Sequence, residues 1–312
     1  MDDFAPVVIP TLNRHMHFKR CIESLAACHH ADKTELYIFL DYPLKDDHWE
    51  GYNIINNYLS TIIGFKAVNI IKRERNYGAY ENPNKAIEYV FKKFDRLIFS
   101  EDDNIFAQDF LRFVNRGLAI YQNRADIFSI SGYHYPVFIP KIYNEDIYLW
   151  QGFSAWGVGF WKHKWKKVNS EKINSAAIVR DFLKHYYSVY RYQKIANHYL
   201  PSLLCMLKRQ MIMGDSYINL YLFRNNMYSV FPSVSRVRNT GHDGSGVHSV
   251  YKVDDIFSKQ DLFNGRDNYL LPFNIKSNKI VTASLYTYFK IPIKYKITAF
   301  IKLFLYNIGY RY

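Results

Sequence analysis

The stretch that decides the fold is Leu97-Ile98-Phe99-Ser100-Glu101-Asp102-Asp103. Its short apolar run is typical of a buried strand, and the run leads directly into the acids. Adjacent acids at such a place are unfavourable unless a cation lies there. Mg²⁺ and Mn²⁺ prefer carboxylate oxygens, so the stretch predicts a metal site at the end of a strand. The alternative is a solvated acidic turn or a helix cap.

Further strand candidates lie before this stretch, at residues 5–9, 36–40 and 67–71. Segments with helical spacing of apolar residues separate them, and Asn82-Pro83 predicts a helix that begins at Pro83 with Asn82 as its cap. Continuous apolar strands that alternate with helices indicate a parallel sheet covered on both faces. The sequence therefore predicts an α/β fold.

Polar residues follow the predicted strands at their carboxyl ends. Arg14 comes shortly after the first strand, Asp41 after the second, and Glu101-Asp102-Asp103 after the fourth. Ligands of open α/β sheets bind outside the carboxyl ends of the strands. We therefore expect these residues to gather at one edge of the sheet.

The pattern changes after Asp103. Residues 127–131 and 147–150 are strand candidates, residues 171–225 have mostly helical spacing, and residues 239–248 form a glycine-rich loop. No linker divides the chain. We expect one catalytic domain over residues 1–267 and a basic, aromatic-rich, helical C-terminal extension over residues 268–312.

The composition limits the partners. The net charge of +13 suits an anionic partner, while RNA-binding aromatic signatures and zinc-finger spacings are absent from the sequence, so no nucleic acid is expected. The odd count of 3 cysteines fits a reducing compartment. After Asp267 the chain has no acid, which favours contact with an anionic membrane surface. The alternative is a helix packed on the domain.

These motifs resemble the GT-A glycosyltransferase pattern, with the greatest similarity to bacterial family-two sugar transferases and to N-acetylglucosaminyltransferase I. The resemblance covers roughly residues 5–250. It rests on Ile9-Pro10-Thr11-Leu12-Asn13-Arg14, on Asp41, on Arg75-Asn76-Tyr77-Gly78, and on Phe99 to Asp103 followed by Asp109-Phe110. It implies a GT-A-like, mostly parallel sheet flanked by helices.

The resemblance also implies roles for single residues. Asp103 would bind a Mn²⁺ or Mg²⁺ ion on the donor diphosphate, and Glu101 and Asp102 would contact the sugar and ribose. His248 would complete the metal shell, with His242 as the alternative. The loop residues that would hold the nucleotide are Pro10, Thr11, Arg14, Asp41, Asn76 and Gly78.

Further candidates lie later in the chain. Asp215 opens an apolar helical stretch, and the resemblance implies that it is the catalytic base of an inverting transfer; the alternative is a helix N-cap. Trp156, in a segment rich in glycine and tryptophan, offers a stacking face for the donor or acceptor, unless it is a core residue. Arg236 and Arg238, just before the glycine-rich loop, could also meet phosphate.

The sequence therefore predicts a metal-dependent glycosyltransferase that moves a sugar from a nucleotide-diphosphate donor, such as a UDP-sugar, to a glycan or lipid-linked acceptor hydroxyl. We expect an inverting enzyme of bacterial surface polysaccharide synthesis, cytoplasmic and peripheral on the inner face of the membrane. One alternative is a nucleotidyltransferase, which the lack of glycine in the loop after the first strand disfavours. Another is a non-catalytic, membrane-associated glycan-binding protein, which leaves the acids unexplained.

Overall fold

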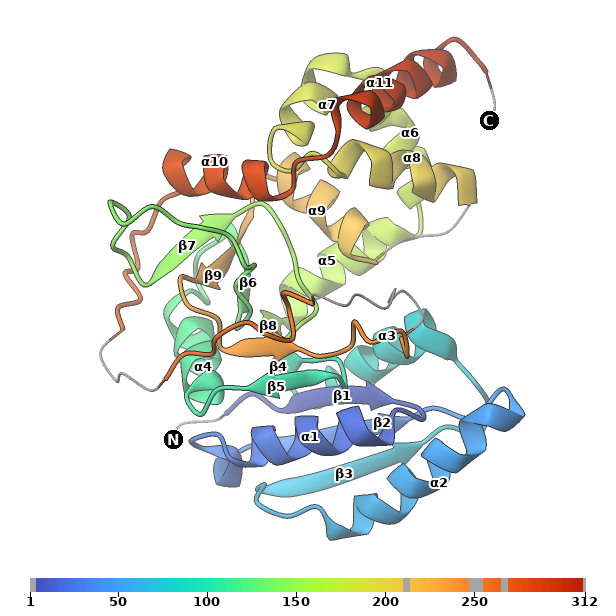
Figure 1. The fold of residues 1–312 in the computed structure, drawn as a ribbon, viewed down its shortest axis with the longest axis vertical. Helices are drawn as coiled ribbons and strands as arrows, with labels where there is room; N and C mark the ends of the chain where they lie inside the picture. Colours follow the sequence, from blue (N-terminus) through green and yellow to red (C-terminus); the bar gives the residue numbers. More distant parts are fainter. Residues whose placement is uncertain (1–3, 210–213, 247–254, 265–268, 311–312) are drawn as a thin grey trace.

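The computed structural model describes residues 4–209, 214–246, 255–264 and 269–310. It confirms the α/β class: a mostly parallel sheet lies among helices, and further helices form the C-terminal part (Figure 1). The strands are β1 (Val7–Thr11), β2 (Glu35–Leu40), β3 (Ala67–Lys72), β4 (Arg96–Phe99), β5 (Asn104–Phe106), β6 (Ile127–Ser131), β7 (Ile147–Trp150), β8 (Val158–Trp161), β9 (Tyr228–Pro232) and β10 (Val237–Asn239).

Eight of these strands form one sheet in the order β3-β2-β1-β4-β8-β6-β9-β7. The first four are parallel, so their carboxyl ends meet at one edge. β8 is antiparallel to both β4 and β6, β6 is parallel to β9, and β7 closes the sheet antiparallel to β9. Strands β5 and β10 form a separate antiparallel pair that follows β4 directly.

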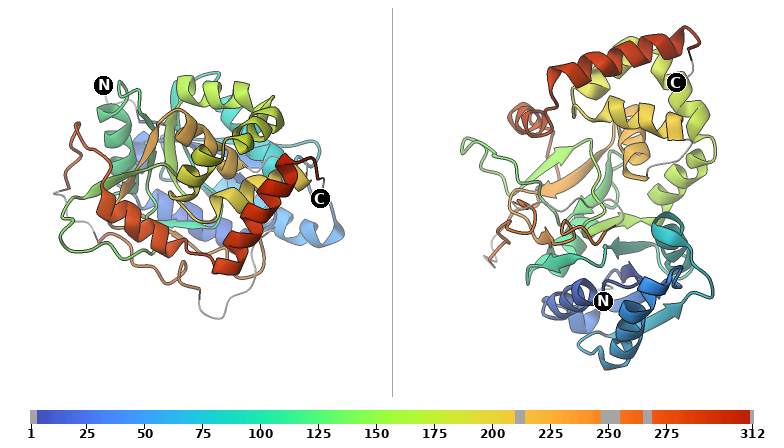
Figure 2. Two further views of the ribbon diagram at one scale, coloured as in Figure 1. Left: turned by 90° about the horizontal axis from the view of Figure 1, so that it is seen from above. Right: turned by 45° about the vertical axis from the view of Figure 1, so that its right-hand side comes forward.

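Helices cover both faces of the sheet and at its far end build a helical half (Figures 1 and 2). Besides three short 3₁₀ turns at residues 31–33, 46–48 and 59–61, the helices are α1 (His15–Ala26), α2 (Trp49–Tyr58), α3 (Gly78–Val90), α4 (Phe110–Ile120), α5 (Lys162–Lys172), α6 (Ser175–Lys184), α7 (Tyr186–Gln193), α8 (Tyr199–Arg209), α9 (Gly214–Arg224), α10 (Lys279–Tyr288) and α11 (Ile293–Asn307).

Alternation along the central strands sends side chains into two cores. Val8 belongs to the core that α3 covers, while its neighbours Val7 and Ile9 belong to the core that α1 and α4 cover. All three are fully buried. A strand with both faces buried has no polar position, which explains why these strands read as continuous apolar runs.

The predicted start of α3 is wrong. The helix begins at Gly78 rather than at Pro83, and Pro83 lies inside it. Asn82 caps nothing, because its side chain bonds Arg73 and the carbonyl of Phe39. The acceptor comes from the residue after β2: the Asp41 carboxylate accepts hydrogen bonds from the N–H groups of Tyr77, which precedes the helix, and of Gly78, its first residue.

The C-terminal extension is helical, as expected, and packs on the domain. Its buried residues Val281, Leu285, Ala299 and Leu303 belong to the same core as α8 and α9. Helix α11 lies on the outside of the helical half, at the end of the molecule away from α1 and α2 (Figures 1 and 2). No described helix is both long enough and apolar enough to cross a bilayer.

Candidate active site

The acids after β4 meet the end of β1, as the sequence predicts. Pro10 and Thr11 end β1, and the Thr11 hydroxyl donates to Asp102 Oδ2 at 2.7 Å. The Arg14 guanidinium bridges both aspartates: Nη1 lies 2.8 Å from Asp103 Oδ2, and Nη2 bonds Asp102 Oδ1. Each aspartate is only 5% exposed, so this arginine, rather than bulk water, offsets part of their negative charge.

A second segment that the sequence did not assign holds Asp103. The Asn239 amide donates to Asp103 Oδ1 at 2.7 Å, and Thr240 donates its N–H and hydroxyl to the Asp103 carbonyl, both at 2.9 Å. Gly241 follows so closely that a Cβ added to it would lie 2.0 Å from Asp103 Oδ2. Only glycine fits against the carboxylate at this position.

Helix α1 anchors the same loop. His17 Nε2 lies 3.1 Å from the Thr240 carbonyl and 3.2 Å from Asp243 Oδ2. His242 stacks on Phe257 with 4.5 Å between ring centroids. The loop from β10 therefore lies over the acids, and His242 lies beside the site.

Glu101 lies between this cluster and an aromatic group. Its Oε2 accepts a hydrogen bond from Trp156 Nε1 at 2.9 Å. The Trp156 ring makes edge-to-face contacts with Tyr133 and His242, so the indole is fixed in orientation. Burial, together with the charges of Asp103 and Asp215, raises the pKa of Glu101 to about 8. An added cation at this place would favour the ionised form of Glu101.

Asp41 lies at the same edge but is engaged with backbone. Its carboxylate accepts hydrogen bonds from the N–H groups of Tyr42, Tyr77 and Gly78, at 3.0, 2.9 and 2.8 Å. Gly78 has φ +73°, a conformation that favours glycine. Asn76 donates to the Tyr42 carbonyl at 2.6 Å. These contacts make Asp41 the organiser of this loop, and a nucleotide contact from the same residues stays a prediction.

Asp215 lies in the first turn of α9. Its side chain is exposed to water, yet the protein around it reduces its hydration enough to raise its pKa to about 6, while Lys172 opposes that change. Its charge also raises the pKa of Glu101, so the two carboxyls face one region. Among the described residues no hydrogen bond ties Asp215 to a helix N–H, so the capping alternative gains no support.

Two late candidates have other outcomes. His248 lies outside the described residues. The phosphate contact predicted for Arg236 is wrong: its side chain is only 1% exposed, pairs with Asp109 at 3.0 Å, and lies against the rings of Phe113 and Phe263. Burial of a paired arginine among aromatic rings is a packing role, and the sequence alone could not distinguish the two.

The acid cluster fits a hard divalent cation. Glu101, Asp102 and Asp103 face a single guanidinium, that of Arg14, so negative charge is in excess. Asp103 accepts one hydrogen bond on each oxygen from Asn239 and Arg14, and a carboxylate has about four acceptor sites, so capacity remains. The described residues contain no set of three or more His, Cys, Asp or Glu side chains arranged as ligands. Mg²⁺-like ions take one or two carboxylates and complete the shell with water and phosphate.

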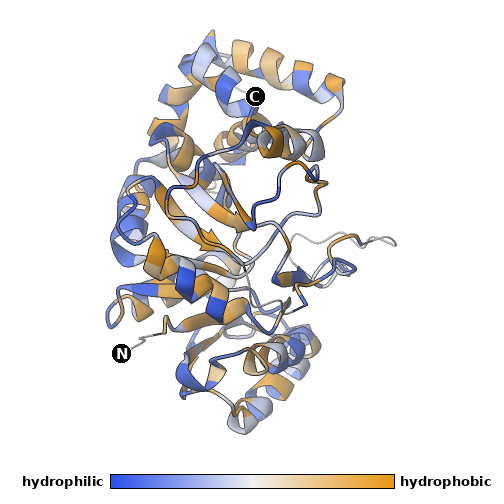
Figure 3. Cartoon of the chain, turned by 90° about the vertical axis from the view of Figure 1, so that its left-hand side faces the viewer, coloured by the Kyte–Doolittle hydropathy of each residue, from blue (hydrophilic) through white to orange (hydrophobic). Residues whose placement is uncertain are grey.

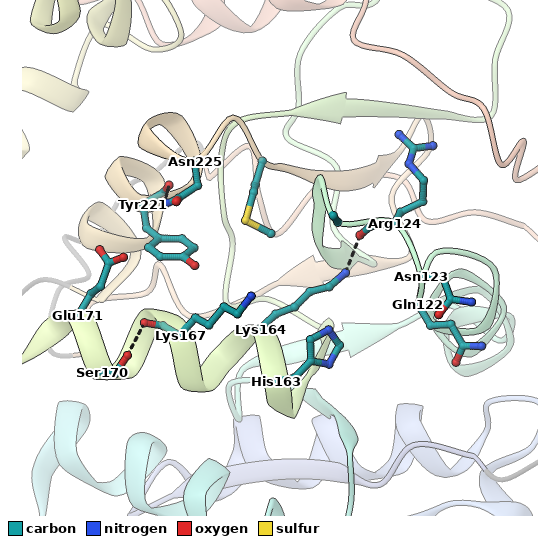
Figure 4. A pocket seen from close by; sticks show the side chains of 12 residues that line it. Gln122, Asn123, Arg124, His163, Lys164, Lys167, Ser170, Glu171, Tyr221 and Asn225 are labelled. Carbon is teal, nitrogen blue, oxygen red and sulfur yellow. Dashed lines mark hydrogen bonds between the residues drawn. The ribbon is translucent and has the colours of Figure 1, made fainter.

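A separate cavity of about 670 Å³ lies between α5, the end of α9 and residues 122–125 (Figure 4). Its lining includes Lys164 and Lys167. Nζ of Lys164 donates to the carbonyls of Arg124 and Ile127. The cavity contains none of the predicted site residues. The acids at the edge of the sheet, where charge is buried and converges, remain the candidate active site.

A known protein family matches part of the first half of the chain. Residues 7–143 match the family model described as glycosyl transferase family 2. Similar solved structures include a mannosyltransferase from Pyrobaculum calidifontis in complex with GDP-Man and Mn²⁺, with 11% identity, 72% of this chain and 70% of that chain covered, and a TM-score of 0.41. TarS of S. aureus, residues 1–349, is 14% identical over 50% of this chain and 47% of that chain, with a TM-score of 0.35. A search of curated proteins found no match.

The match covers the segment that contains the loop after β1, Asp41 and the three acids after β4. The fold around that segment is the α/β arrangement that the motifs predicted. The predicted resemblance is therefore confirmed over residues 7–143, where the chain is similar to glycosyl transferase family 2.

Proposed function

We propose that this enzyme transfers a sugar from a nucleotide-diphosphate donor to an acceptor hydroxyl, with the donor bound at the carboxyl edge of β1 and β4. The observation that carries the proposal is the buried cluster of Asp102, Asp103 and Arg14, with Glu101 beside it. Parallel α/β sheets bind ligands at this edge. A diphosphate brings negative charge to a site that already has an excess of it, which requires a cation in between.

Asp103 would hold a Mn²⁺ or Mg²⁺ ion, with Glu101 near enough to respond to its charge. When bound, the metal would stabilise the negative charge of the departing diphosphate. Arg14 bonds Asp103 at 2.8 Å, so it would orient the carboxylate and add a second positive charge near the phosphates. Asn239 would keep the other Asp103 oxygen in position.

Asp215 would act as general base. An inverting displacement needs one group on the face opposite the leaving group to accept the proton of the acceptor hydroxyl. A pKa near 6 leaves the carboxylate ionised at neutral pH, and it makes the carboxylate more basic than an ordinary aspartate. Trp156, which donates a hydrogen bond to Glu101, would orient the sugar between Asp103 and Asp215.

The finer assignments rest on the charge of the chain and on the family resemblance. The positively charged chain suits an anionic donor such as a UDP-sugar, and a glycan or lipid-linked saccharide would be the acceptor. Bacterial surface polysaccharide synthesis, on the inner face of the membrane, is the process that we propose.

A panel of UDP-sugars and GDP-sugars, each with Mn²⁺, Mg²⁺ or chelator, tests the proposal by thermal shift and by donor hydrolysis. We expect one nucleotide class to stabilise the protein only with metal, by about 2.7 kcal/mol at a hundredfold excess over Kd. Slow metal-dependent release of the nucleoside diphosphate should accompany it. A shift with nucleoside triphosphates and release of pyrophosphate would instead support the nucleotidyltransferase. A protein that responds to no nucleotide would overturn both.

A further inference from the structure

Helix α11 exposes a continuous apolar stripe. Ile293, Ile297, Ile301, Phe304 and Ile308 follow one another at intervals of four, four, three and four residues, the last just beyond the helix end. At 3.6 residues per turn they fall within about 80° of the helix circumference. Their exposed fractions are 70, 53, 53, 55 and 61%. We call these residues the α11 stripe.

The stripe is separate from the face that holds the helix on the protein. Ala299 and Leu303, on the inner face, are 4% and 0% exposed and lie in the core with α8. Phe300 and Tyr306 pack against the same core. Folding therefore uses one face of α11, and the stripe has no cover among the described residues. Figure 3 shows apolar residues along the helices of this end of the molecule.

The charges beside the stripe have one sign. Residues 268–312 contain Lys276, Lys279, Lys290, Lys294, Lys296, Lys302 and Arg311, and no Asp or Glu. At about 100° per residue Lys294 lies about 20° beyond one edge of the stripe and borders it, whereas Lys302 lies about 100° beyond that edge. Lys296, in turn, reaches the hydroxyl of Tyr286 at 3.3 Å on α10.

The end of the helix has an exposed tyrosine. Tyr310 is 66% exposed just past the end of α11, whereas Tyr295, which is 54% exposed, lies about 160° around the helix from the middle of the stripe. Tyrosine concentrates where an apolar phase meets water, because its ring is apolar and its hydroxyl is polar. Lysines place their long apolar stems in such a boundary and their ammonium groups among anionic headgroups.

We infer that the α11 stripe docks on the surface of an anionic lipid bilayer, with the helix lying parallel to the membrane plane. Apolar burial and attraction of lysines to anionic lipids act together in helices of this kind. An apolar protein partner could cover the isoleucines, but it gives no reason why every charged residue of the segment is a cation. The inference stands independently of the proposed glycosyl transfer, since no residue of the acid cluster enters it.

Sedimentation of the whole protein with vesicles tests the inference. Vesicles of neutral phosphatidylcholine are compared with vesicles that contain one third phosphatidylglycerol, each at low and at high salt. We expect binding to the anionic vesicles at low salt, at least tenfold weaker binding to neutral ones, and loss in high salt, because salt screens the lysines.

A matched pair of variants locates the contact. Ile301→Asp should weaken binding to the anionic vesicles by about tenfold or more, the order expected when one large apolar side chain no longer enters the bilayer. Ile63→Asp is the control: Ile63 is 82% exposed and lies between α2 and β3, at the other end of the molecule. It should bind as the wild type does. Both positions are exposed, so both variants should keep the wild-type Tm.

Three results would overturn the inference. The protein could ignore anionic vesicles at low salt, or Ile301→Asp could bind as well as Ile63→Asp. A third result is a dimer that Ile301→Asp dissociates while vesicle binding is absent, which would assign the stripe to a second copy of the chain. Nucleotide binding by Ile301→Asp should equal that of the wild type. An incorrect membrane assignment can therefore be distinguished from an incorrect assignment of the donor site.

Discussion

The acid cluster after β4 and the stripe on α11 reverse the usual placement of residues in opposite directions. Asp102 and Asp103 are charged and only 5% exposed, whereas Ile293 on α11 is apolar and 70% exposed. Charged residues are seldom buried unless they are paired, and a contiguous exposed apolar surface marks an interaction site.

The difference lies in what compensates each region. The buried acids have partners within the chain: Arg14, Thr11 and Asn239 hold their oxygens in fixed positions. The α11 stripe has no such partner among the described residues, and the helix is held only by its other face. A site held by internal partners is preorganised for a small ligand, and a face without partners suits a large external surface.

The largest expected effect is on turnover by Asp103→Ala. Loss of the metal ligand removes several kcal/mol of charge stabilisation, which corresponds to a fall of at least about a hundredfold in kcat. Asp95→Ala is the control, because Asp95 precedes β4 at the opposite end of the same strand and its side chain is 97% exposed. Transfer assays on both variants check this. Equal activities would place the chemistry elsewhere.

Asp215→Asn should be the next largest effect. It keeps size and polarity but removes the base, so kcat should fall by roughly 10² to 10⁴ while donor binding stays unchanged. Asp181→Asn, on an exposed aspartate of α6, is the matched control. Turnover of Asp215→Asn within a few-fold of wild type would exclude Asp215 as the base.

The pH profile separates a base from a structural acid. The pKa of Asp215 is raised to about 6, and a base works only when deprotonated. In the wild type kcat/KM should therefore fall about tenfold per pH unit below pH 6, and be level above it until another group titrates. In Asp215→Asn this acid limb should be absent. An unchanged limb would assign it to another residue.

Gly241→Ala tests how tightly the loop from β10 encloses Asp103. The added Cβ would lie 2.0 Å from the carboxylate oxygen, so either the loop or Asp103 must move. We expect roughly tenfold weaker metal-dependent nucleotide binding by calorimetry, because a displaced ligand loses a hydrogen bond or its orientation. Gly214→Ala, where an added Cβ meets nothing within 4 Å, should bind nucleotide normally. Normal binding by Gly241→Ala would show that the loop does not constrain the acids.

The smallest effect is the change in stability expected from a substitution on the exposed face of α11, and a substitution on its buried face supplies the contrast. Leu303→Ala removes a fully buried side chain and should cost about 2–5 kcal/mol. Ile301→Ala removes an apolar side chain that is 53% exposed and should change stability by less than about 0.5 kcal/mol. Urea denaturation of both variants gives the comparison. A large loss for Ile301→Ala would mean that the stripe is part of the core.

The sequence was most informative where contacts are local. The central strands read as apolar runs because both of their faces are buried, and the order of the chain alone placed Arg14 beside Asp102 and Asp103. Long-range contacts were invisible to it. Asn239 holds Asp103 from 136 residues away, and no local pattern marks that amide as a partner.

The prediction of where α3 begins was also wrong because of a long-range contact. Asn82-Pro83 has the local signature of a helix start, but the helix begins earlier, at Gly78. Asp41 accepts the hydrogen bonds of Tyr77 and Gly78, from which it is separated by 36 and 37 residues in the sequence. The prediction for Arg236 failed because the local sequence does not distinguish an arginine that contacts a phosphate from one that pairs with the buried Asp109.

Calorimetric titration of the cognate nucleoside diphosphate into wild type and Asp103→Ala, with Mn²⁺ and with chelator, tests the central claim most directly. We predict binding by the wild type that chelator weakens at least tenfold. Asp103→Ala should bind weakly in both conditions, at the level of the chelated wild type, with its Tm within a few degrees of the wild-type value. Binding by Asp103→Ala that still tightens with Mn²⁺ as it does in the wild type would contradict the assignment of the acid cluster as the donor and metal site.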